Sequence, residues 1–542
     1  MKKSQENTFD YIIVGAGSAG CALAARLSEN PNVSVCLLEA GGPDKSVFIH
    51  APVGVAAMLP TKINNWAFET IPQPGLNGRK GYQPRGKTLG GSSSTNAMLY
   101  VRGNQWDYDN WAALGNEGWA YKDILPYFKK SEGNEEFHDS YHGSNGPLGV
   151  SNATDASNLN DMFINSCQQH GIKYNPDYNG ADQNGAFMYQ RTIKNGERCS
   201  AAKAFLTPNM NRDNLTVITH ALTEKILLEG KKAIGVRYQK NSMTIDINCN
   251  EEVILSSGAF GSPQILMLSG IGASKHLNEK DITCVHDLPG VGQNLQDHID
   301  YVQTYKVDSS QDTFGLSVKG GTSMLKSMFE WKRNRTGKIT STLAESGAFF
   351  STEEYTVAPD AQFVFVPGIV DDHARKVNWG HGYSCHITVL RPESVGEVKL
   401  HSSNPKDSLL IDPKYLSHKK DMEVIINGAK KMQTILEGNP FDNIRKGMLY
   451  HVGNDEQLTQ DIRTRADTQY HPCGTCKMGT VADKMAVVDT NLKVYGMQGL
   501  RVADASIMPK IVSGNTNAPT IMIGEKAADM ILANYEENKK HA

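Results

Sequence analysis

The sequence predicts an α/β protein, α+β overall, in which a Rossmann-like dinucleotide-binding domain is combined with a discontinuous substrate-binding domain of sheet and helices. Three observations support this prediction. A strand–turn–helix–strand unit opens the chain, short β-rich segments recur between residues 205 and 300, and residues 305–460 carry few glycine motifs. With 542 residues, of which 39% are hydrophobic and 21% charged, the chain can bury a large core.

The N-terminal unit carries a GxGxxG turn. Its elements are a strand at residues 10–14, a glycine turn at 15–20, a helix at 18–29 and a strand at 33–39. Gly15 permits the tight turn, Gly17 lets a pyrophosphate approach the backbone, and Gly20 lets helix and strand pack closely. Glu39 ends the second strand, where it can accept hydrogen bonds from ribose hydroxyls. Because this acid would repel a 2′-phosphate, NADP is disfavoured, while NAD and FAD both remain open.

A second glycine-rich segment spans residues 85–103. Gly90 and Gly91 precede three serines, so this run exposes backbone N–H groups and hydroxyls that suit a polar cofactor. The alternative is a flexible linker. Apolar residues flank the run tightly, which favours the cofactor interpretation.

Further elements follow in the middle of the chain and at its C-terminal end. The β-rich segments are residues 214–218, 224–228, 233–237 and 252–255. A glycine turn at Gly258 leads into a short helix that Gly270 and Gly272 end. A last helix is predicted at residues 519–534, since Pro519 lacks an N–H that would have no partner in a first helical turn.

The composition excludes several classes of protein. Lys and Arg number 55 against 58 Asp and Glu, a net charge of −3, so no nucleic-acid partner is expected. The odd number of cysteines, nine, leaves a thiol unpaired and favours a reducing cytoplasm. No apolar stretch approaches the roughly 20 residues of a membrane span. We therefore expect a cytoplasmic protein, with peripheral contact to the inner membrane left open.

Taken together, the motifs resemble those of the glucose–methanol–choline (GMC) family of FAD-dependent oxidoreductases over essentially the whole chain. The segments that carry the resemblance are residues 15–20, 86–109, 258–272, 471–475 and 504–525. Within the family they look most like choline dehydrogenases and bacterial alcohol dehydrogenases. The resemblance implies FAD as the cofactor, and oxidation of an alcohol, primary in the expected case, to the aldehyde by hydride transfer to flavin N5.

The resemblance also implies roles for particular residues. His471 would be the base that removes the hydroxyl proton, and Asn515 would orient the alcohol oxygen. Asp504 would bind the ribityl chain, and Thr223 would meet the adenine through its backbone. The amides near Asn517 and Ala518, at the start of the last helix, would face the flavin edge that becomes negative. The full set of expected cofactor contacts is Gly15, Gly17, Ser18, Ala19, Gly20, Glu39, Ala40, Gly90, Gly91, Asn96, Ala97, Thr223, Ala503, Asp504, Asn515 and Thr516.

Three further positions carry expectations of their own. Family members with covalent flavin have a histidine where this chain has Thr95, so FAD is expected to be noncovalent. Cys473 and Cys476 form a CxxC pair, which we interpret as packed thiols, and no metal site is expected. His298 lies in a motif-like stretch that we interpret as a structural loop, with a catalytic role as the alternative.

The predicted organisation divides the chain into five segments. The FAD-binding domain is expected from residues 1–155, 192–305 and 463–542, and the substrate-binding domain from residues 156–191 and 306–462. The expected partners are an alcohol and an electron acceptor such as a quinone or an electron-transfer protein. Two other functions remain open: an alcohol oxidase that uses O2, and a hydroxynitrile lyase that holds FAD without redox use. Choline as substrate would need an acidic or aromatic cage, for which Glu345 and Trp66 are available.

Overall fold

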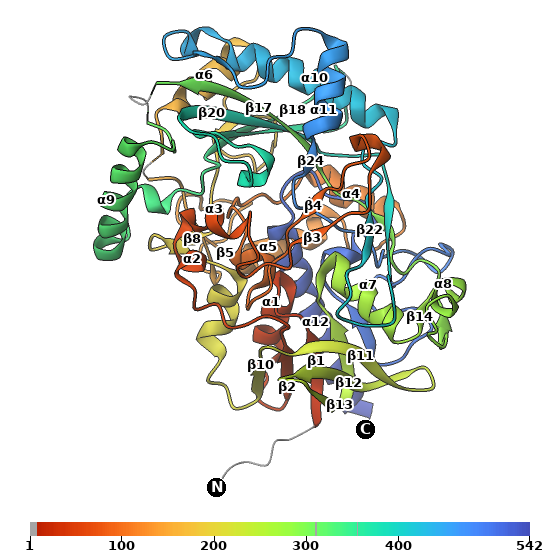
Figure 1. The fold of residues 1–542 in the computed structure, drawn as a ribbon. Coiled ribbons are helices and arrows are strands. Elements are labelled where there is room, and N and C mark those ends of the chain that lie inside the picture. Colours follow the sequence, from red (N-terminus) through yellow and green to blue (C-terminus); the bar gives the residue numbers. More distant parts are fainter. Residues whose placement is uncertain (1–7, 155, 309–311, 355, 542) are drawn as a thin grey trace.

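Two sheets stacked along the long axis of the molecule organise the protein. The computed structural model describes residues 8–541 apart from 155, 309–311 and 355. The strands of one sheet lie at the lower end in Figure 1, and those of the other lie at the upper end beneath α6, α10 and α11. The residues that build the functional site come from both.

The lower sheet has seven strands from three separate parts of the chain. Their order is β10 (Leu215–Ile218), β2 (Val35–Leu38), β1 (Thr8–Val14), β13 (Met243–Leu255), β12 (Lys232–Lys240) and β11 (Leu222–Glu229), with β25 (Leu500–Val502) also paired to β13. Pairings among β10, β2, β1, β13 and β25 are parallel, whereas β11, β12 and β13 are antiparallel. The carboxyl ends of the parallel strands therefore share one edge, where ligands of such sheets bind.

One difference from the expectation lies in β13. The sequence predicts a strand only at residues 252–255, but β13 begins at Met243 and forms a long hairpin with β12. Asn241 and Ser242 at the turn both have positive φ, 49° and 64°, as primed hairpin turns require. The first half of β13 consists mostly of exposed, polar residues, so no run of apolar residues marks it as a strand in the sequence.

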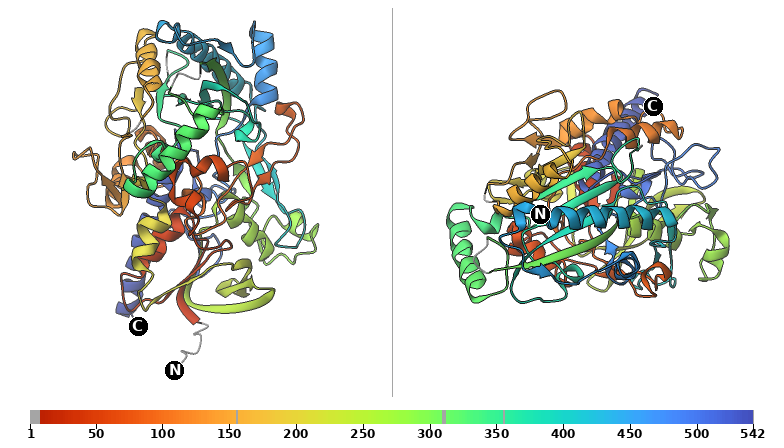
Figure 2. Two further views of the ribbon diagram at one scale, coloured as in Figure 1. Left: turned by 60° about the vertical axis from the view of Figure 1, so that its left-hand side comes forward. Right: turned by 90° about the horizontal axis from the view of Figure 1, so that it is seen from above.

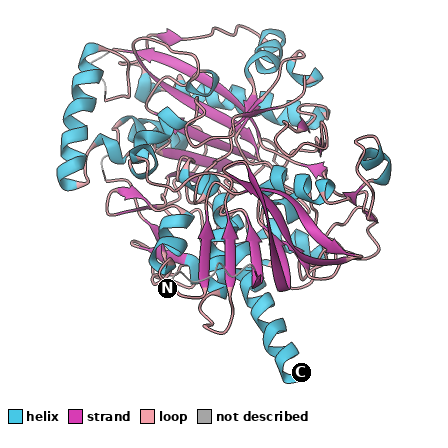
Figure 3. Ribbon diagram, turned by 60° about the horizontal axis from the view of Figure 1, so that its bottom comes forward, coloured by secondary structure: helices cyan, strands magenta, loops and turns pink. Residues whose placement is uncertain are grey.

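Two helices distant in sequence pack together beside the parallel strands. They are α1 (Ser18–Leu27), which is two residues shorter than predicted, and α12 (Asn517–His541), which is longer than predicted at both ends. Figure 3 shows α12 running past the strands to the C-terminus. A Cβ at Gly524 would lie 2.7 Å from the Ala19 carbonyl oxygen, and Arg26 donates to the fully buried Glu525 carboxylate at 2.7 Å. Helix α12 thus packs on α1 and holds it against the sheet.

The upper sheet is antiparallel. Its order is β23 (Gly447–Met448), β17 (Ile299–Val307), β20 (His381–Val389), β19 (Ala361–Val366), β18 (Ser346–Phe350) and β7 (Gly185–Met188), with β24 (Asp467–Thr468) also paired to β17. Phe363 and Phe365 pack in one apolar cluster with residues of α6 (Leu159–Gln169) and α10 (Lys419–Leu436). Because side chains alternate along a strand, Val364 and Val366 point the other way, toward the site. Seen from above, α10 lies across this sheet (Figure 2).

Shorter elements connect these layers. The remaining α-helices are α2 (Val47–His50), α3 (Val55–Met58), α4 (Gln105–Ala113), α5 (Tyr121–Ser131), α7 (Gly258–Leu268), α8 (Ser274–Asn278), α9 (Val318–Asn334) and α11 (Asp455–Arg465). The remaining strands are β3 (Phe68–Glu69), β4 (Tyr82–Gln83), β5 (Glu132–Asn134), β6 (Leu148–Val150), β8 (Ile193–Lys194), β9 (Glu197–Arg198), β14 (Ile271–Gly272), β15 (His286–Asp287), β16 (Gln293–Leu295), β21 (Gly396–Lys399) and β22 (Leu410–Asp412). Within the described ranges, no helix combines the length and apolar character needed to cross a membrane.

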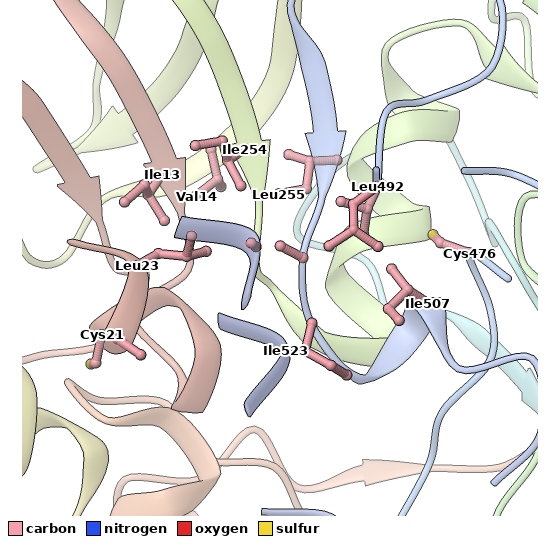
Figure 4. Packing of buried hydrophobic residues seen from close by; sticks show 14 of the residues in the cluster. Ile13, Val14, Cys21, Leu23, Ile254, Leu255, Cys476, Leu492, Ile507 and Ile523 are labelled. Carbon is pink, nitrogen blue, oxygen red and sulfur yellow. The ribbon is translucent and has the colours of Figure 1, made fainter. Parts of the chain in front are cut away.

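The lower sheet and its helices enclose the largest apolar cluster. Figure 4 shows side chains of β1 and β13 side by side in this cluster, with Ile523 of α12 below the ends of the strands. Cys476 belongs to the same cluster, and Cys473 is equally buried. Burial raises the pKa of both thiols well above the usual value. Such thiols behave as small apolar side chains, as the sequence predicts for them.

The five-segment division stays a prediction. Strands from residues 8–38, 215–255 and 500–502, all within the predicted FAD-binding segments, share the lower sheet. The predicted boundary at residue 305 falls inside β17 of the upper sheet. The boundary at residue 155 lies outside the described residues.

Candidate active site

A cavity of about 400 Å³ runs between the two sheets, from the glycine turn of the N-terminal unit to the inner face of the upper sheet. This volume falls within the range of ligand sites, about 300–1,000 Å³. Glu39 and Gly17 line one end, whereas Val364, Val366 and His471 line the other. The two ends are built differently.

Backbone geometry shapes the first end. Gly15 has φ +102°, and a Cβ there would lie 2.6 Å from the Ser256 carbonyl oxygen. A Cβ on Gly20 would lie 1.9 Å from the Gly15 carbonyl oxygen, so this glycine lets α1 approach β1. At Gly17, in contrast, the nearest atom would be 3.8 Å away, and the space beside it opens to the cavity. Gly15 thus serves the turn and Gly20 the packing of α1 on β1, whereas the space beside Gly17 is left open to the cavity.

The start of α1 faces the same space. Gly17 is the N-cap residue and provides no capping side chain, and Ser18 and Ala19 line the cavity. The first N–H groups of a helix have no partner within it and carry a partial positive charge. This end of the cavity therefore fits the pyrophosphate of a dinucleotide.

Glu39 lies at the end of β2, beside the cavity wall that Ala40 continues. Its carboxylate accepts hydrogen bonds from the Ala16 N–H at 3.0 Å and the Gly41 N–H at 2.7 Å. Burial raises its pKa to about 7, although these N–H groups oppose the shift. Each oxygen retains a lone pair for a ligand hydroxyl.

The second glycine-rich segment closes over the first. Gly91, Thr95, Asn96 and Ala97 line the cavity, whereas Gly90 donates its N–H to the Ala16 carbonyl at 2.7 Å and holds the segment in place.

Three of the expected cofactor contacts, namely Gly20, Gly90 and Ala503, are not part of the cavity lining, whereas Thr223, Asp504 and Thr516 are. Asp504 already accepts hydrogen bonds from the Gly258 N–H, the Ser262 hydroxyl and the Ser506 N–H.

At the other end, His471 and Asn515 lie together, as the family resemblance implies. The Asn515 Nδ2 lies 3.1 Å from His471 Nε2, and both residues line the cavity. Asn515 Oδ1 accepts a hydrogen bond at 3.4 Å from Nε2 of Gln362, on the inner face of β19. These contacts fix the orientation of the amide, with its NH2 group toward His471.

His298 fixes the tautomer of His471. Its Nε2 lies 3.0 Å from the Leu390 carbonyl oxygen, which can only accept, so this nitrogen carries the proton. His298 Nδ1 is then an acceptor, and His471 Nδ1, 2.9 Å away, must donate to it. His471 Nε2 is consequently left with a lone pair, which is what a general base needs.

Burial keeps both imidazoles neutral. It lowers the pKa of His298 to about 4 and that of His471 well below the usual value, and for His471 the neighbouring His298 and Arg85 lower it further.

The backbone before His471 is held in a strained conformation. Tyr470 has φ +69°, rare for a bulky side chain. Arg85 donates to the Tyr470 carbonyl at 2.6 Å, and the Asp297 carboxylate accepts the His471 N–H at 2.9 Å. Nothing in the sequence singled out Arg85 or Gln362, since Arg85 only begins the second glycine-rich segment and Gln362 is a single polar residue in an apolar strand. The stretch that contains His298 was interpreted as a structural loop, and it lies directly behind His471.

Apolar side chains dominate the wall beside His471, namely Leu343, Ala344, Val364, Val366 and Val370. Within the described lining, Glu39 and Asp504 are the carboxylates, and they follow β2 and β25 of the lower sheet. Glu345, a candidate for a choline cage, is not part of this lining. Its carboxylate accepts from Ser157 N–H, Asn160 Nδ2 and the Ser341 hydroxyl. Trp66 does line the cavity, but the Lys87 ammonium lies 4.0 Å from its ring.

Comparisons with known proteins agree with this geometry. The family models described as GMC oxidoreductase match residues 9–300 and 392–524. An alcohol dehydrogenase (acceptor) of Pseudomonas putida is 46% identical, over 97% of this chain and 96% of its own. A mitochondrial choline dehydrogenase of Homo sapiens is 42% identical, over 96% and 89%. Among solved structures, a pyridoxine 4-oxidase from Mesorbium loti has a TM-score of 0.87 at 30% identity, covering 96% of this chain and 98% of its own.

Proposed function

Since the chain belongs to the GMC oxidoreductase family, we propose that His471 and Asn515 carry out its reaction, with a neutral alcohol as the substrate. The enzyme is an FAD-dependent dehydrogenase that oxidises a CH–OH group. When bound, FAD supplies the acceptor for the hydride that leaves the carbinol carbon.

The proposal depends most on the lone pair at His471 Nε2. The Asn515 NH2 lies 3.1 Å from this nitrogen, so an alcohol oxygen beside the pair can reach both groups, giving its proton to His471 Nε2 while Asn515 donates to the oxygen. The depressed pKa of His471 keeps the base free at neutral pH. On the opposite side of the ring His298 Nδ1 accepts a hydrogen bond from the His471 Nδ1–H, which keeps His471 in the tautomer whose Nε2 is free of a proton.

The residues around the cavity support noncovalent binding of FAD. The amides at the start of α1 and the start of α12 would bind its anionic groups, because Ser18, Ala19 and Thr516 line the cavity there. Thr95, also in the lining, offers no imidazole for a covalent bond. Acid precipitation of the holoenzyme should therefore release the yellow colour to the supernatant. Flavin retained by the precipitate would contradict this.

The wall beside His471 favours an apolar primary alcohol over choline. The valines and Leu343 offer dispersion contacts, and no carboxylate of the described lining lies in this wall to balance a trimethylammonium charge. Lys87 on the Trp66 ring adds a positive charge where a cation would otherwise bind.

Anaerobic reduction of the flavin by a panel of alcohols tests this function. Straight-chain primary alcohols should bleach the yellow flavin, with kcat/KM rising as the chain lengthens, while choline should react far more slowly. A hydroxynitrile lyase would stay yellow with every alcohol. Choline as the best substrate would overturn the proposed alcohol class but not the roles of His471 and Asn515.

We further propose that a quinone or an electron-transfer protein, rather than O2, reoxidises the enzyme. The name of the Pseudomonas putida relative supports an acceptor of this kind, although other relatives are named oxygen-dependent choline dehydrogenases. All nine cysteines are free thiols, which fits a reducing compartment such as the cytoplasm. Parallel assays with a quinone analogue and with O2 distinguish the acceptors, and faster turnover with O2 would contradict the proposal.

A further inference from the structure

Helix α9 (Val318–Asn334) packs on the rest of the protein through one side only. It stands at the left edge of the molecule in Figure 1 and in the right-hand view of Figure 2, and it faces the viewer in the left-hand view of Figure 2. Ser317 caps its start by accepting the Gly320 N–H, and Arg335 ends it in a left-handed conformation. Trp331 and Met324 lie in a small apolar cluster with residues near α2 and α3. This contact fixes the helix and leaves its opposite side uncovered.

The uncovered side is apolar. Val318 is 87% exposed and Phe329 75%, and Leu325 and Met328 are more than half exposed. These four positions fall on one stripe at 3.6 residues per turn, away from Trp331. A surface helix normally presents mainly polar residues on this side, so the exposed apolar stripe departs from the usual pattern.

A neighbouring loop continues the stripe. Leu316 and Gly380 exchange backbone hydrogen bonds at 2.9 and 3.0 Å, which places residues 377–379 beside the start of α9. In this loop Trp379 is 79% exposed and Val377 more than half exposed. We call these six side chains, Val318, Leu325, Met328, Phe329, Val377 and Trp379, the α9 apolar face.

Basic residues lie along the face, three of them on one side of it and Lys332 within it. Helix α9 carries Lys319, Lys326, Lys332 and Arg333, all exposed, against one acid, Glu330. In the described part of the chain, none of these four cations forms an ion pair, whereas Glu330 accepts from the Thr336 hydroxyl. An apolar stripe bordered by unpaired cations matches the boundary between anionic headgroups and acyl chains.

We propose that the α9 apolar face inserts into an anionic lipid surface and attaches the enzyme peripherally to a membrane. A second copy of the chain is a poorer occupant, since an isologous contact would bring the four cations of one helix against the same cations of the other. The proposal does not rest on the proposed substrate.

The α9 apolar face lies close to the cavity, so attachment to a membrane would affect access to the site. His373 and Ala374 line the cavity, and the chain reaches Val377 and Trp379 directly after them. On the other side of the face, Val53 packs in the cluster that holds Trp331, and Val55 lines the cavity. The membrane would thus lie beside the cavity wall, where apolar molecules dissolved in the bilayer can reach the enzyme.

Sedimentation of the holoenzyme with vesicles tests the proposal. Vesicles of phosphatidylcholine and phosphatidylglycerol in equal parts should bind the enzyme, and pure phosphatidylcholine should bind it much less. Replacing Leu325 and Phe329 by Ser should weaken binding at least ~10-fold. Replacing Lys326 and Arg333 by Gln should weaken it about fivefold per charge, and added salt should act in the same direction.

Two matched variants provide the control. Met243 and Val481 are also exposed apolar residues, far from α9 in sequence, and changing them to Ser should leave vesicle binding unchanged. All four variants should keep wild-type flavin content and activity with a water-soluble alcohol, since none lines the cavity. Equal binding by wild type and the Leu325/Phe329 variant would overturn the proposal. The proposal would also be overturned if the wild type does not bind vesicles but forms a dimer without lipid, and the Leu325/Phe329 variant is a monomer.

Trp379 supplies a direct readout of insertion. Vesicles with brominated acyl chains should quench part of the tryptophan fluorescence of the wild type, and Trp379→Phe should lose most of this quenching while still sedimenting with the vesicles. Unchanged quenching in Trp379→Phe would mean that another surface faces the lipid.

Discussion

The two ends of the cavity solve different physical problems. At the lower end the wall is mostly backbone: glycines bring α1, β1 and the segment at Gly91 within a few ångströms of one another, and helix amides carry the charge. At the upper end the wall is side chains, with His471 and Asn515 held by His298 and Gln362 from elsewhere in the chain. Substitutions at the lower end should change the steric fit and the binding of FAD. Those at the upper end should change the rate of the reaction.

The largest effect is expected at Gly20. A Cβ there would lie 1.9 Å from the Gly15 carbonyl oxygen, so Gly20→Ala must push α1 off β1 and should yield no stable holoenzyme. Gly17→Ala meets only the Ser256 carbonyl oxygen, at 3.8 Å, so its apoprotein should fold normally and yet bind FAD weakly. Thermal unfolding of the apoprotein and flavin content distinguish the two defects.

Gly321→Ala is the matched control for these glycine variants. It lies in α9, where a Cβ has nothing within 4 Å, and it should bind FAD normally. Normal flavin affinity in Gly17→Ala would show that the cofactor does not approach this backbone.

The next largest effects are expected at His471 and Asn515. His471→Ala should keep FAD but slow its reduction by an alcohol at least ~10²-fold, and Asn515→Ala should slow it ~10²–10³-fold. Because both residues act on one oxygen, the double variant should be far less impaired than the product of the singles. Asn515→His should retain more activity than Asn515→Ala, since an imidazole can also donate.

Anaerobic stopped-flow reduction measures all four enzymes. Nearly wild-type reduction of His471→Ala would place the base elsewhere, and strictly multiplicative losses would mean that the two side chains act independently.

A smaller effect, about tenfold, is expected when His298 is replaced by Ala. His471 Nδ1 then loses its acceptor, and its tautomer is no longer fixed. His298 also helps to lower the pKa of His471, so its loss should raise that pKa. The wild type should keep its reduction rate as the pH falls below 6.5, whereas the rate of His298→Ala should begin to fall at higher pH.

The pH profile distinguishes this role from simple destabilisation. His298→Asn, whose Oδ1 can accept from His471, should restore part of the rate and of the profile. A lower rate with an unchanged pH profile would leave His298 a packing residue only.

The smallest effect is expected at Glu39. Glu39→Gln sets an NH2 group against one of two N–H donors and should weaken FAD binding about fivefold. Burial raises the pKa of Glu39 from 4.5 to about 7, so the folded apoprotein keeps a proton that the unfolded chain releases. The free energy of unfolding of the wild type, relative to Glu39→Gln, should therefore fall as the pH rises from 4.5 to 7 and then level off. Denaturation at about pH 5 and about pH 8 measures this, and a constant difference would contradict it.

Local patterns and long-range contacts explain what could be predicted. The βαβ unit was predictable because Gly15, Gly17, Gly20 and Glu39 lie within one short stretch whose spacing itself determines the turn. The pairing of His471 with Asn515 was inferred from the family resemblance, not from the residues themselves, because 44 positions separate them.

The supporting residues could not be predicted in the same way. Gln362 reaches Asn515 only because β19 places it on the inner face of the upper sheet, and His298 accepts from His471 because Leu390 fixes its proton. These contacts join segments 153 and 173 residues apart, and no local spacing encodes them. The exposed stripe of α9 could not be predicted, because apolar residues at helical spacing normally face the core.

The packing of α1 against α12 implies a long delay during synthesis between the translation of α1 and the formation of its final contacts. Leu27 ends α1 and Asn517 begins α12, so 517 − 27 = 490 residues must be translated before the two helices can meet. At about 5–20 residues per second this takes roughly 25–100 s. Throughout that interval the apolar side of the nascent α1 lacks its final partner, and we expect chaperones to shield it. The phosphate end of the cavity, although encoded first, would be among the last parts of the enzyme to become rigid.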